Sequence, residues 1–518
     1  MFTAKGFVNA AGFGFLLLLA TGGSALANAQ AIQPDPVQPR YWNYDGQTIL
    51  LVGGSQEENL FQFDSLEAHL DLLVSAGGNY VRNTMNSSDA GNVWPFERLP
   101  DGRYDLNRLS DEYYARLERL LDLAFERDII VQIELWDRFD FAQEPWLSNP
   151  YRPANNVNYS LVESGLDNEY LSHPGQNENP FFRSVPVLDG NAVILPYQQR
   201  QVDRLLQISF AFPNVIYTID NETSGTAEWA AYWATYIQRR AAERGTIAYV
   251  TEMWGARDLH AEQHQRTLDH PELYAFADIS QNNHQIGDQH WNDLMWVREY
   301  IADRSRPLNN VKIYGADGGR FGDTREGIER FWRNIFGGAA SARFHRPPGG
   351  IGLSAIAQAH IRSARLLQTH FDIFAAQPDA GHTLLLEREP AEAYLAFTPS
   401  SQYAVYFPQG GSVELDLRDE SGQFSMQWLN ATTGSLSQEG SVEGGGMVRL
   451  VSPGNDHWIA ILATGSVEDP GPVPPPDPVP PPGPVPPPDP VPPPDPVPPP
   501  GPVPPPCPKG ETIECLLN

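Results

Sequence analysis

Short apolar runs alternate with amphipathic helical stretches between about residues 41 and 368. This alternation is typical of a parallel βα architecture, in which each strand is followed by a helix that packs on the sheet. One such helix is predicted at residues 110–128, where four leucines mix with charged residues at helical spacing. Eight candidate strands follow the same pattern, at residues 48–54, 79–85, 128–136, 214–220, 247–254, 274–280, 311–317 and 341–347. The sequence therefore predicts a closed (β/α)8 TIM barrel over residues 38–368.

The sequence pattern changes after the predicted barrel. From about residue 371 the helical pattern ends, and strands separated by Gly-rich turns predict a small β-sandwich over residues 371–466. Residues 467–506 then repeat the hexads GPVPPP and DPVPPP, a composition that favours a stiff polyproline II spacer. A short tail, residues 507–518, contains both cysteines of the chain. In an oxidising compartment Cys507 and Cys515 could form a local disulfide, but they cannot link the main fold.

The N-terminus has the pattern of an export signal. Lys5 precedes an apolar stretch at residues 7–20, and small residues follow in SALANA. This arrangement predicts a secretory signal over residues 1–29 with cleavage near Ala27 or Ala29, and the apolar run is short for a membrane span. A secreted or periplasmic location is therefore expected.

Charge excludes two classes of partner. The chain has 35 Lys and Arg against 64 Asp and Glu, a formal net charge of −29 at pH 7. Such a surface repels phosphate backbones and anionic membranes, so a nucleic-acid or membrane-surface protein is disfavoured.

One predicted connection is unusually long. Between residues 137 and 194 the sequence has little periodicity, many Asn and Pro residues, and scattered aromatics such as Trp146, Phe181 and Phe182. Long loops in compact enzymes often build binding sites or lids. In a barrel, this one would lie over the C-terminal mouth, where its aromatics either pin the loop down or contact substrate.

Polar and aromatic residues cluster where the predicted strands end, which is where barrel enzymes place their chemistry. They are Arg82, Asn83, Trp136, Asp137, Asn221, Glu222, Glu252, Trp254, Asn282, His284, Asp317 and His345. The sequence shows no metal-ligand spacing, no nucleophile elbow and no Gly-rich phosphate loop among them. No metal or organic cofactor is therefore implied.

Two of these strand-end carboxylates suggest a reaction. Glycosidic bonds are hydrolysed by two carboxyl groups, one of which protonates the leaving oxygen while the other attacks or activates water. Glu222 follows predicted strand four and Asp317 follows predicted strand seven, and these strands face each other across an eight-stranded barrel. We predict Glu222 and Asp317 as the catalytic pair. The predicted substrate-binding residues are Arg82, Asn83, Trp136, Asn221, Glu252, Trp254, His284 and His345.

The Asn221-Glu222 pair at the end of strand four resembles the acid/base signature of the clan A glycoside hydrolases, which include cellulases, mannanases and apiosidases. Arg82 in the second strand matches the arginine that contacts the nucleophile in that clan, and apiosidase-like members also pair a barrel with a small β domain. The resemblance implies that Glu222 is the general acid/base, that Asn221 binds the 2-hydroxyl, and that the strand-seven carboxylate is the nucleophile. The expected activity is hydrolysis of a plant or algal polysaccharide or oligosaccharide.

One departure from the clan pattern leaves the nucleophile open. The clan uses glutamate there, whereas this chain offers Asp317, whose side chain is shorter. The resemblance favours retention of the anomeric configuration, but the shorter side chain leaves inversion open. If Asp317 is not the partner of Glu222, Glu252 and Glu134 are the next candidates.

Each assignment also has a purely structural alternative. Asn221-Glu222 could be the N-terminal cap of a helix, Arg82 could pair with a buried carboxylate, and Asp317 could be a turn residue. Two other functions remain in view, a carbohydrate-binding barrel without activity and a polysaccharide lyase. A lyase is disfavoured because the strand ends offer mainly carboxylates rather than the basic groups that neutralise a uronate.

Overall fold

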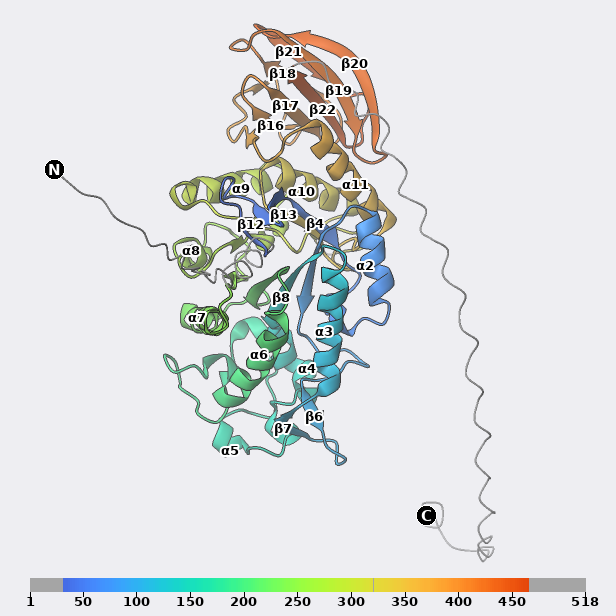
Figure 1. The fold of residues 1–518 in the computed structure, drawn as a ribbon. Coiled ribbons are helices and arrows are strands. Elements are labelled where there is room, and N and C mark those ends of the chain that lie inside the picture. Colours follow the sequence, from blue (N-terminus) through green and yellow to red (C-terminus); the bar gives the residue numbers. More distant parts are fainter. Residues whose placement is uncertain (1–30, 320, 465–518) are drawn as a thin grey trace, which may run out of the picture. The chain divides into compact units, whose positions relative to one another are not determined.

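The computed structural model of the protein describes residues 31–319 and 321–464 (Figure 1). The predicted signal segment, the proline-rich spacer and the Cys507–Cys515 pair lie outside these residues. Within the described ranges, no helix combines the length and the hydropathy needed to cross a membrane.

Parallel strands form the centre of the larger part of the chain. Their bounds are β4 (Leu51–Gly54), β5 (Tyr80–Thr84), β8 (Ile130–Trp136), β9 (Val215–Asp220), β10 (Val250–Thr251), β11 (Ala277–Asp278), β12 (Leu308–Asn309) and β13 (Ser341–Phe344). The sheets have the orders β10-β9-β8-β5, β13-β4 and β11-β12. The amide of Asn79 donates to the carbonyl of Val52, and the amide of Ala340 donates to that of Leu308. These bonds connect the three sheets into one series of neighbours that follows the chain order, as predicted.

Helices follow the strands and surround them (Figure 1). Their bounds are α2 (Leu66–Ser75), α3 (Asp111–Phe125), α6 (Leu195–Ser209), α7 (Ala227–Glu243), α8 (Glu262–Leu268), α9 (Gly287–Tyr300), α10 (Thr324–Phe336) and α11 (Ala355–His370). The helix predicted at residues 110–128 is confirmed as α3. It begins after Ser110, whose side chain accepts from the amide of Tyr113, and its buried face includes Leu117, Leu120 and Leu121.

Among the predicted strands, the seventh, at residues 311–317, differs most from the observed structure. In place of a strand over residues 311–317, regular pairing is limited to β12, and Ile313 alone forms a bridge with Phe344. Side-chain amides replace part of the ladder here, because Asn283 Nδ2 donates to the carbonyl of Lys312 and to Asn310 Oδ1. The segment is therefore buried but irregular, and it ends before Gly315, whose φ of 118° turns the chain away.

Short antiparallel elements also occur, and apart from residues 48–49, which fall in the first predicted strand, they were not predicted. They are β1 (Gln33–Pro34), β2 (Trp42–Tyr44) and β3 (Gln47–Ile49) in one sheet and β6 (Phe96–Arg98) with β7 (Tyr104–Leu109) in another. Strands of two or three residues are too short to show an alternating pattern, which explains why the sequence did not reveal most of them.

The connection between β8 and α6 is packed onto the protein. It contains the short helices α4 (Gln143–Ser148) and α5 (Leu161–Ser164). Trp146, Phe181 and Phe182 are buried, and the rings of Phe141 and Phe181 lie 4.2 Å apart. The loop aromatics therefore hold the connection down rather than forming an exposed platform.

Antiparallel strands follow α11. One sheet has the order β14-β16-β17-β22-β19-β20 and the other β15-β18-β21. Their bounds are β14 (Gln377–Pro378), β15 (Leu385–Leu386), β16 (Tyr394–Thr398), β17 (Gln402–Phe407), β18 (Ser412–Asp416), β19 (Gln423–Asn430), β20 (Ser435–Glu443), β21 (Met447–Val451) and β22 (Trp458–Thr464). Side chains of both sheets, such as Leu415 and Leu462, share one buried apolar cluster. Tyr406 and Ile459 belong instead to the apolar core of the parallel part, so the two parts share buried surface.

Candidate active site

A cavity of about 580 Å³ opens where several parallel strands end. The loop after β4 contributes Glu58 to it, the end of β8 contributes Asp137, and the end of β9 contributes Asn221 and Glu222. The irregular segment after β12 and the end of β13 supply the opposite wall, including Lys312, Tyr314, His345 and Arg346. Residues from distant parts of the sequence therefore meet in one hollow.

Glu222 is held in an unusual backbone conformation. Its φ is 47°, in the left-handed region that non-glycine residues rarely adopt. The flanking amides fix it there, because Asn221 donates to the carbonyl of Trp136 and Thr223 donates to that of Met253. Helix α7 starts only at Ala227 and is capped by Thr226, so Asn221-Glu222 is not a helix cap. Such strain persists only where the surroundings enforce it, and it often accompanies functional sites.

A lysine and a tyrosine hold the carboxylate of Glu222 in its charged form. Lys312 Nζ lies 2.7 Å from Glu222 Oε1, and the Tyr314 hydroxyl donates to the same oxygen at 2.6 Å. Burial alone would raise the pKa of Glu222, but the charge of Lys312 and the two hydrogen bonds outweigh it and lower the pKa to about 2. Burial and the charge of Glu222 raise the pKa of Tyr314 well above its usual value, so Tyr314 remains a donor. Glu222 is thus an anion at neutral pH.

Asp137 has the opposite protonation tendency. It is buried to 6% exposure, and burial raises the pKa of its carboxyl, with a further contribution from the negative charge of Glu58. Asn221 connects it to the Glu222 cluster, since Asn221 Nδ2 donates to Asp137 Oδ1 at 3.3 Å and Asn221 Oδ1 accepts from Lys312 Nζ at 2.7 Å. One cavity thus contains one carboxyl group with a lowered pKa and another with a raised pKa.

Glu58 is a second ionised carboxylate on the wall. Its Oε1 lies 3.0 Å from His345 Nε2 and 3.3 Å from Arg346 Nε. Burial would raise the pKa of Glu58, but His345 and the charge of Arg82 outweigh it and hold the pKa well below its usual range. Burial lowers the pKa of His345 to about 4, so at neutral pH His345 serves Glu58 as a hydrogen-bond partner rather than as a cation.

The structure does not bring Asp317 together with Glu222. Asp317 is exposed, and its backbone amide and side chain bond to Thr324 at the start of α10. The prediction of a facing catalytic pair on strands four and seven therefore needs correction. The positions that face Glu222 from this part of the chain are Lys312 and Tyr314, and Asp317 lies beyond the turn at Gly315.

Arg82 and Asn83 on β5 are fully buried and do not line the cavity. Arg82 Nε and Nη2 each donate to the carboxylate of Glu134 on β8 at 2.9 Å. Arg82 and Glu134 therefore form a buried ion pair. Arg82 reaches the site indirectly, because its Nη1 lies 3.7 Å from Glu58 Oε1. Asn83 Oδ1 accepts from the amide of Phe61, which fixes the loop that leads from Glu58.

Three further predicted binding residues are also structural. Trp136 is buried among the rings of Phe181, Trp229 and Trp233. Trp254 is buried and donates to Thr267 Oγ1. Glu252 accepts from the backbone amides of Asp220 and Met253 and does not line the cavity, so it is no partner for Glu222.

The two histidines divide between the wall and the layer behind it. His345 lines the cavity. His284 packs against the rings of Tyr314 and Phe321, which are themselves wall residues. Burial and the charge of Arg257 lower the pKa of His284 to about 4, so it contributes a neutral ring.

Sequence reasoning missed Glu58, Lys312 and Tyr314 as site residues. A usable signal existed for two of them, because Lys312 and Tyr314 are two positions apart on a predicted strand and therefore share one face. Glu58 lies four residues after β4 and gave no such signal. Asp137 was one of the strand-end residues but was not chosen.

Charge limits what the cavity can hold. Its wall contains five carboxyl groups, Glu57, Glu58, Asp89, Asp137 and Glu222, against the two cations Lys312 and Arg346. The described residues contain no group of three or more His, Cys, Asp or Glu arranged to hold a metal ion. The arrangement can donate a proton, accept a proton and bind hydroxyl groups.

Comparison with solved structures identifies the fold. A glycoside hydrolase of family 5 from Bacteroides vulgatus is similar with a TM-score of 0.58 and 13% identity, covering 86% of this chain and 94% of its own. A second structure, described as a glycoside hydrolase, has a TM-score of 0.58 at 11% identity and covers 85% and 98%. A putative glycoside hydrolase from Bacteroides vulgatus has a TM-score of 0.55 at 12% identity and covers 84% and 83%. No protein-family model and no curated protein matches the sequence. The chain therefore has the mixed α/β fold of these hydrolase structures.

Proposed function

We propose that the protein is an exported glycoside hydrolase that cleaves a neutral glycosidic bond in a plant or algal polysaccharide or oligosaccharide. The scaffold is taken to be a closed (β/α)8 barrel followed by a β-sandwich. Export rests on the signal pattern of residues 1–29.

One observation carries the proposal. Glu222 and Asp137 line the same cavity, and their surroundings move their pKa values in opposite directions. Two carboxyl groups with separated pKa values are what an acid and a base need in order to act together on one bond. The fold shared with the similar glycoside hydrolase structures supports this proposal.

The roles follow from the opposite directions of the two pKa shifts. Asp137, whose raised pKa favours the protonated form, donates its proton to the glycosidic oxygen as the bond to the anomeric carbon breaks. Glu222, the anion, either attacks that carbon from the other face or takes a proton from an attacking water. Water supplies the hydroxyl of the new reducing end, and its remaining proton restores Asp137. The base or nucleophile role for Glu222 replaces the general acid/base role that the clan A resemblance implies, because a pKa of about 2 is too low for a proton donor.

The acidic wall also favours an uncharged sugar at the cleavage point. A carboxylate or sulfate on that sugar would meet an excess of negative charge on the cavity wall. The same argument weakens the lyase alternative, which requires a uronate in the site.

The test is incubation of the purified protein with a panel of neutral plant and algal polysaccharides and their oligosaccharides. We expect new reducing ends and chromatographically resolved products, without the ultraviolet absorbance of an unsaturated lyase product. Glu222→Gln serves as the inactive control. Ultraviolet-absorbing products, or products formed equally by Glu222→Gln, would rule the proposal out.

A carbohydrate-binding protein without activity is the second candidate. The specific observation in its favour is that Lys312 and Tyr314, rather than a carboxylate, face Glu222. Glycan binding measured by calorimetry, without product release from that same glycan after prolonged incubation, would select this candidate.

Asp317→Ala is expected to change kcat/KM by less than about threefold, because Asp317 is exposed and its hydrogen bonds within the described residues are to Thr324. The measurement is kcat/KM on the best glycan of the panel. Thr324→Ala, which removes one hydrogen bond of the same turn, is the matched control. A loss of 100-fold or more in Asp317→Ala alone, on the order of a lost general acid or base, would restore the original catalytic pair.

Tyr314→Phe is expected to move the acid limb of kcat/KM toward higher pH. The hydroxyl of Tyr314 stabilises the anion of Glu222, so its removal raises the pKa of Glu222 from about 2 toward its ordinary value. Activity requires the anion and is therefore lost at a higher pH as the solution is acidified. A pH profile of kcat/KM for both proteins checks the direction, and an unchanged or lower acid limb would contradict the role assigned to Glu222.

A further inference from the structure

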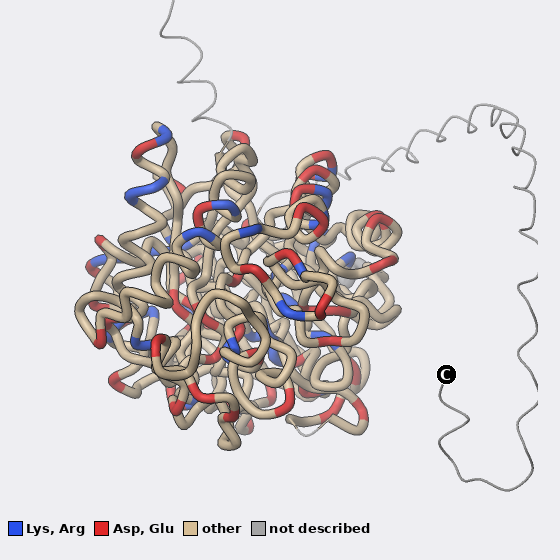
Figure 2. Tube along the Cα trace, turned by 90° about the horizontal axis from the view of Figure 1, so that it is seen from below, with Lys and Arg blue, Asp and Glu red and all other residues tan. Residues whose placement is uncertain are grey.

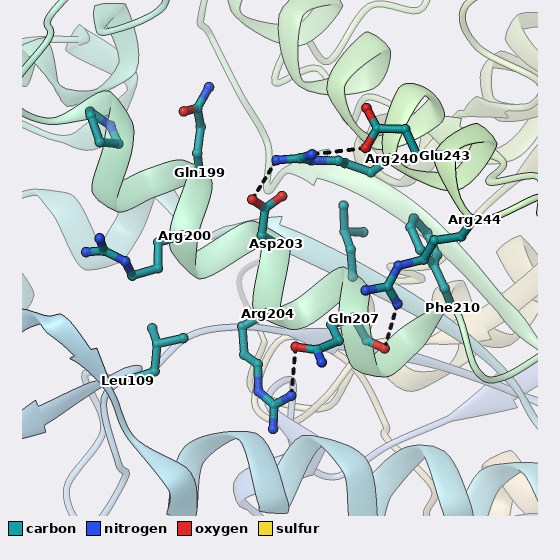
Figure 3. Close-up of a pocket in the computed structure, with 12 residues that line it drawn as sticks. Leu109, Gln199, Arg200, Asp203, Arg204, Gln207, Phe210, Arg240, Glu243 and Arg244 are labelled. Atoms are coloured by element: carbon teal, nitrogen blue, oxygen red, sulfur yellow. Dashed lines mark hydrogen bonds and ion pairs between the residues drawn. The ribbon is translucent and has the colours of Figure 1, made fainter.

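A second hollow, of about 810 Å³, lies between α6 and α7 and shares no wall residue with the cavity of Glu222 (Figure 3). Helix α6 contributes Arg200 and Arg204, and the end of α7 with the residue after it contributes Arg240 and Arg244. The two carboxylates of the hollow are Asp203 and Glu243. Four cations thus meet two anions in a protein whose net charge is −29.

Both carboxylates are engaged by one of the four arginines. Arg240 Nη2 lies 2.7 Å from Asp203 Oδ2, and Arg240 Nη1 lies 3.0 Å from Glu243 Oε2 (Figure 3). Within the described part of the chain, the other three arginines bond to neutral oxygens only. Arg200 donates to the carbonyl of Leu106 and to Asn107 Oδ1, Arg204 to Gln207 Oε1, and Arg244 to the carbonyl of Gln207.

The spacing of the two arginines on α6 is unfavourable for that helix. Arg200 and Arg204 are four residues apart, and like charges at this spacing destabilise a helix. Acidic residues, which would relieve the repulsion, are abundant elsewhere in the chain (Figure 2). Arg240 and Arg244 stand at the C-terminal end of α7, where cations are favourable, so helix stability leaves the α6 pair without an account.

Aromatic rings hold the unpaired guanidinium groups in place. Arg200 lies over Tyr197 at 5.6 Å, Arg204 over Tyr114 at 5.8 Å, and Arg244 over Phe210 at 6.0 Å. A guanidinium group that lies over an aromatic ring loses less conformational freedom when it binds a ligand. Its N–H groups lie in the guanidinium plane and remain available to donate to the oxygens of a sulfate or carboxylate.

From this geometry we propose that the hollow between α6 and α7 binds an anionic saccharide unit, with its sulfate or carboxylate on Arg200, Arg204 and Arg244. Gln199 and Gln207 on the same wall offer amide groups for the sugar hydroxyls. An extended nucleic acid or an anionic membrane is a poorer occupant, because the chain has a formal net charge of −29, which repels an extended polyanion.

The two sites then divide one substrate between them, an inference that rests on the proposed hydrolase function. The acidic cavity of Glu222 excludes a charged ring, whereas the arginine hollow selects one. A polysaccharide that contains both neutral and anionic sugars would be held through its charged units at α6 and α7 and cleaved at a neutral unit.

The test is calorimetric titration of the purified protein with four probes: a sulfated galactan tetrasaccharide, a galacturonan tetrasaccharide, a neutral cello-oligosaccharide of the same length, and sodium sulfate. We expect at least one of the anionic tetrasaccharides to bind more tightly than the neutral probe and than sulfate alone, with an affinity that falls as salt is added. The double variant Arg204→Gln/Arg244→Gln is expected to weaken that binding by about tenfold or more, because charge-assisted hydrogen bonds are lost. Arg98→Gln, an exposed arginine on β6 outside the hollow, is the matched control and is expected to bind as the unchanged protein does.

Thermal melting and near-ultraviolet circular dichroism check that the variants fold. If the Gln double variant does not fold, Arg204→Lys/Arg244→Lys replaces it, because lysine keeps the charge but lacks the planar guanidinium. Equal affinity for the neutral probe, affinity for sulfate equal to that for the anionic tetrasaccharides, or unchanged binding in the double variant would overturn the proposal. Glu222→Gln is expected to bind the anionic tetrasaccharide normally, so failure of the hydrolase function and failure of this site give different results.

Discussion

Glu222→Gln is expected to lower kcat/KM for glycan hydrolysis by about 10³-fold or more, near the upper part of the range for a positioned acid or base. The substitution keeps the shape of the side chain and removes its charge, so the base or nucleophile is lost while the cavity is retained. The measurement is product release under single-turnover and steady-state conditions. A loss of less than about tenfold would show that Glu222 does not act on the reacting atoms.

The control for this prediction concerns Lys312. Its side chain is only 4% exposed, and the neutral amide of Glu222→Gln removes the carboxylate that pairs with it at 2.7 Å. Breaking a buried ion pair from one side can cost about 3–5 kcal/mol of folding free energy, which could mimic a loss of activity. Glu222→Gln/Lys312→Met removes both charges. If this double variant melts like the unchanged protein and remains inactive, the loss belongs to chemistry rather than to folding.

Asp137→Asn is expected to lower kcat/KM by about 10²–10⁴-fold on natural glycans, whose leaving oxygen needs a proton. The effect should be much smaller on a dinitrophenyl glycoside, because its leaving group departs as a stable anion. Asparagine keeps Oδ1, which accepts from the amide of Phe139 and from Asn221, and it loses the bond that Oδ2 accepts from Asn86 Nδ2. A structural role for Asp137 would instead depress both substrates equally, and that result would contradict the assignment.

The pH dependence gives a second check on Asp137. Its pKa is raised by burial and by the charge of Glu58, and the protonated form is the active one. Activity is therefore present below this raised pKa and is lost as the pH rises through it, whereas the anion of Glu222 sets the acid limb at much lower pH. In Asp137→Asn the basic limb of kcat/KM should disappear. If it persists unchanged, another group controls that limb.

Local pattern accounts for much of the fold. The leucine spacing in residues 110–128 and the cap at Ser110 are properties of a single segment, and α3 forms as predicted. The apolar run before Asp220 likewise specifies β9 and correctly places Asn221 and Glu222 at its end, on the cavity. The same reasoning succeeds for β17 and β22, whose short apolar runs are buried along most of their length.

The local sequence pattern fails to predict the structure where side chains take the place of backbone hydrogen-bond partners. The segment after β12 reads as a strand up to Asp317, but Asn283 and Asn310 take over backbone partners, and the chain turns at Gly315. Asp317 lies three residues after Tyr314 and five after Lys312, and such odd spacings would place it on the other face of an alternating segment. For this reason Lys312 and Tyr314 occupy the place that was predicted for Asp317.

The sequence by itself therefore determined the alternation of strands and helices, the antiparallel texture after residue 371 and the position of Glu222 at a strand end, because each depends on neighbours within a few residues. Only the tertiary structure decided the chemistry of that position. The pKa of Glu222 depends on Lys312, which is 90 residues away in the sequence and 2.7 Å away in space, and the pKa of Asp137 depends on its burial and on Glu58. Protonation is set by burial and by charges at short range, and both are properties of the folded chain rather than of any segment.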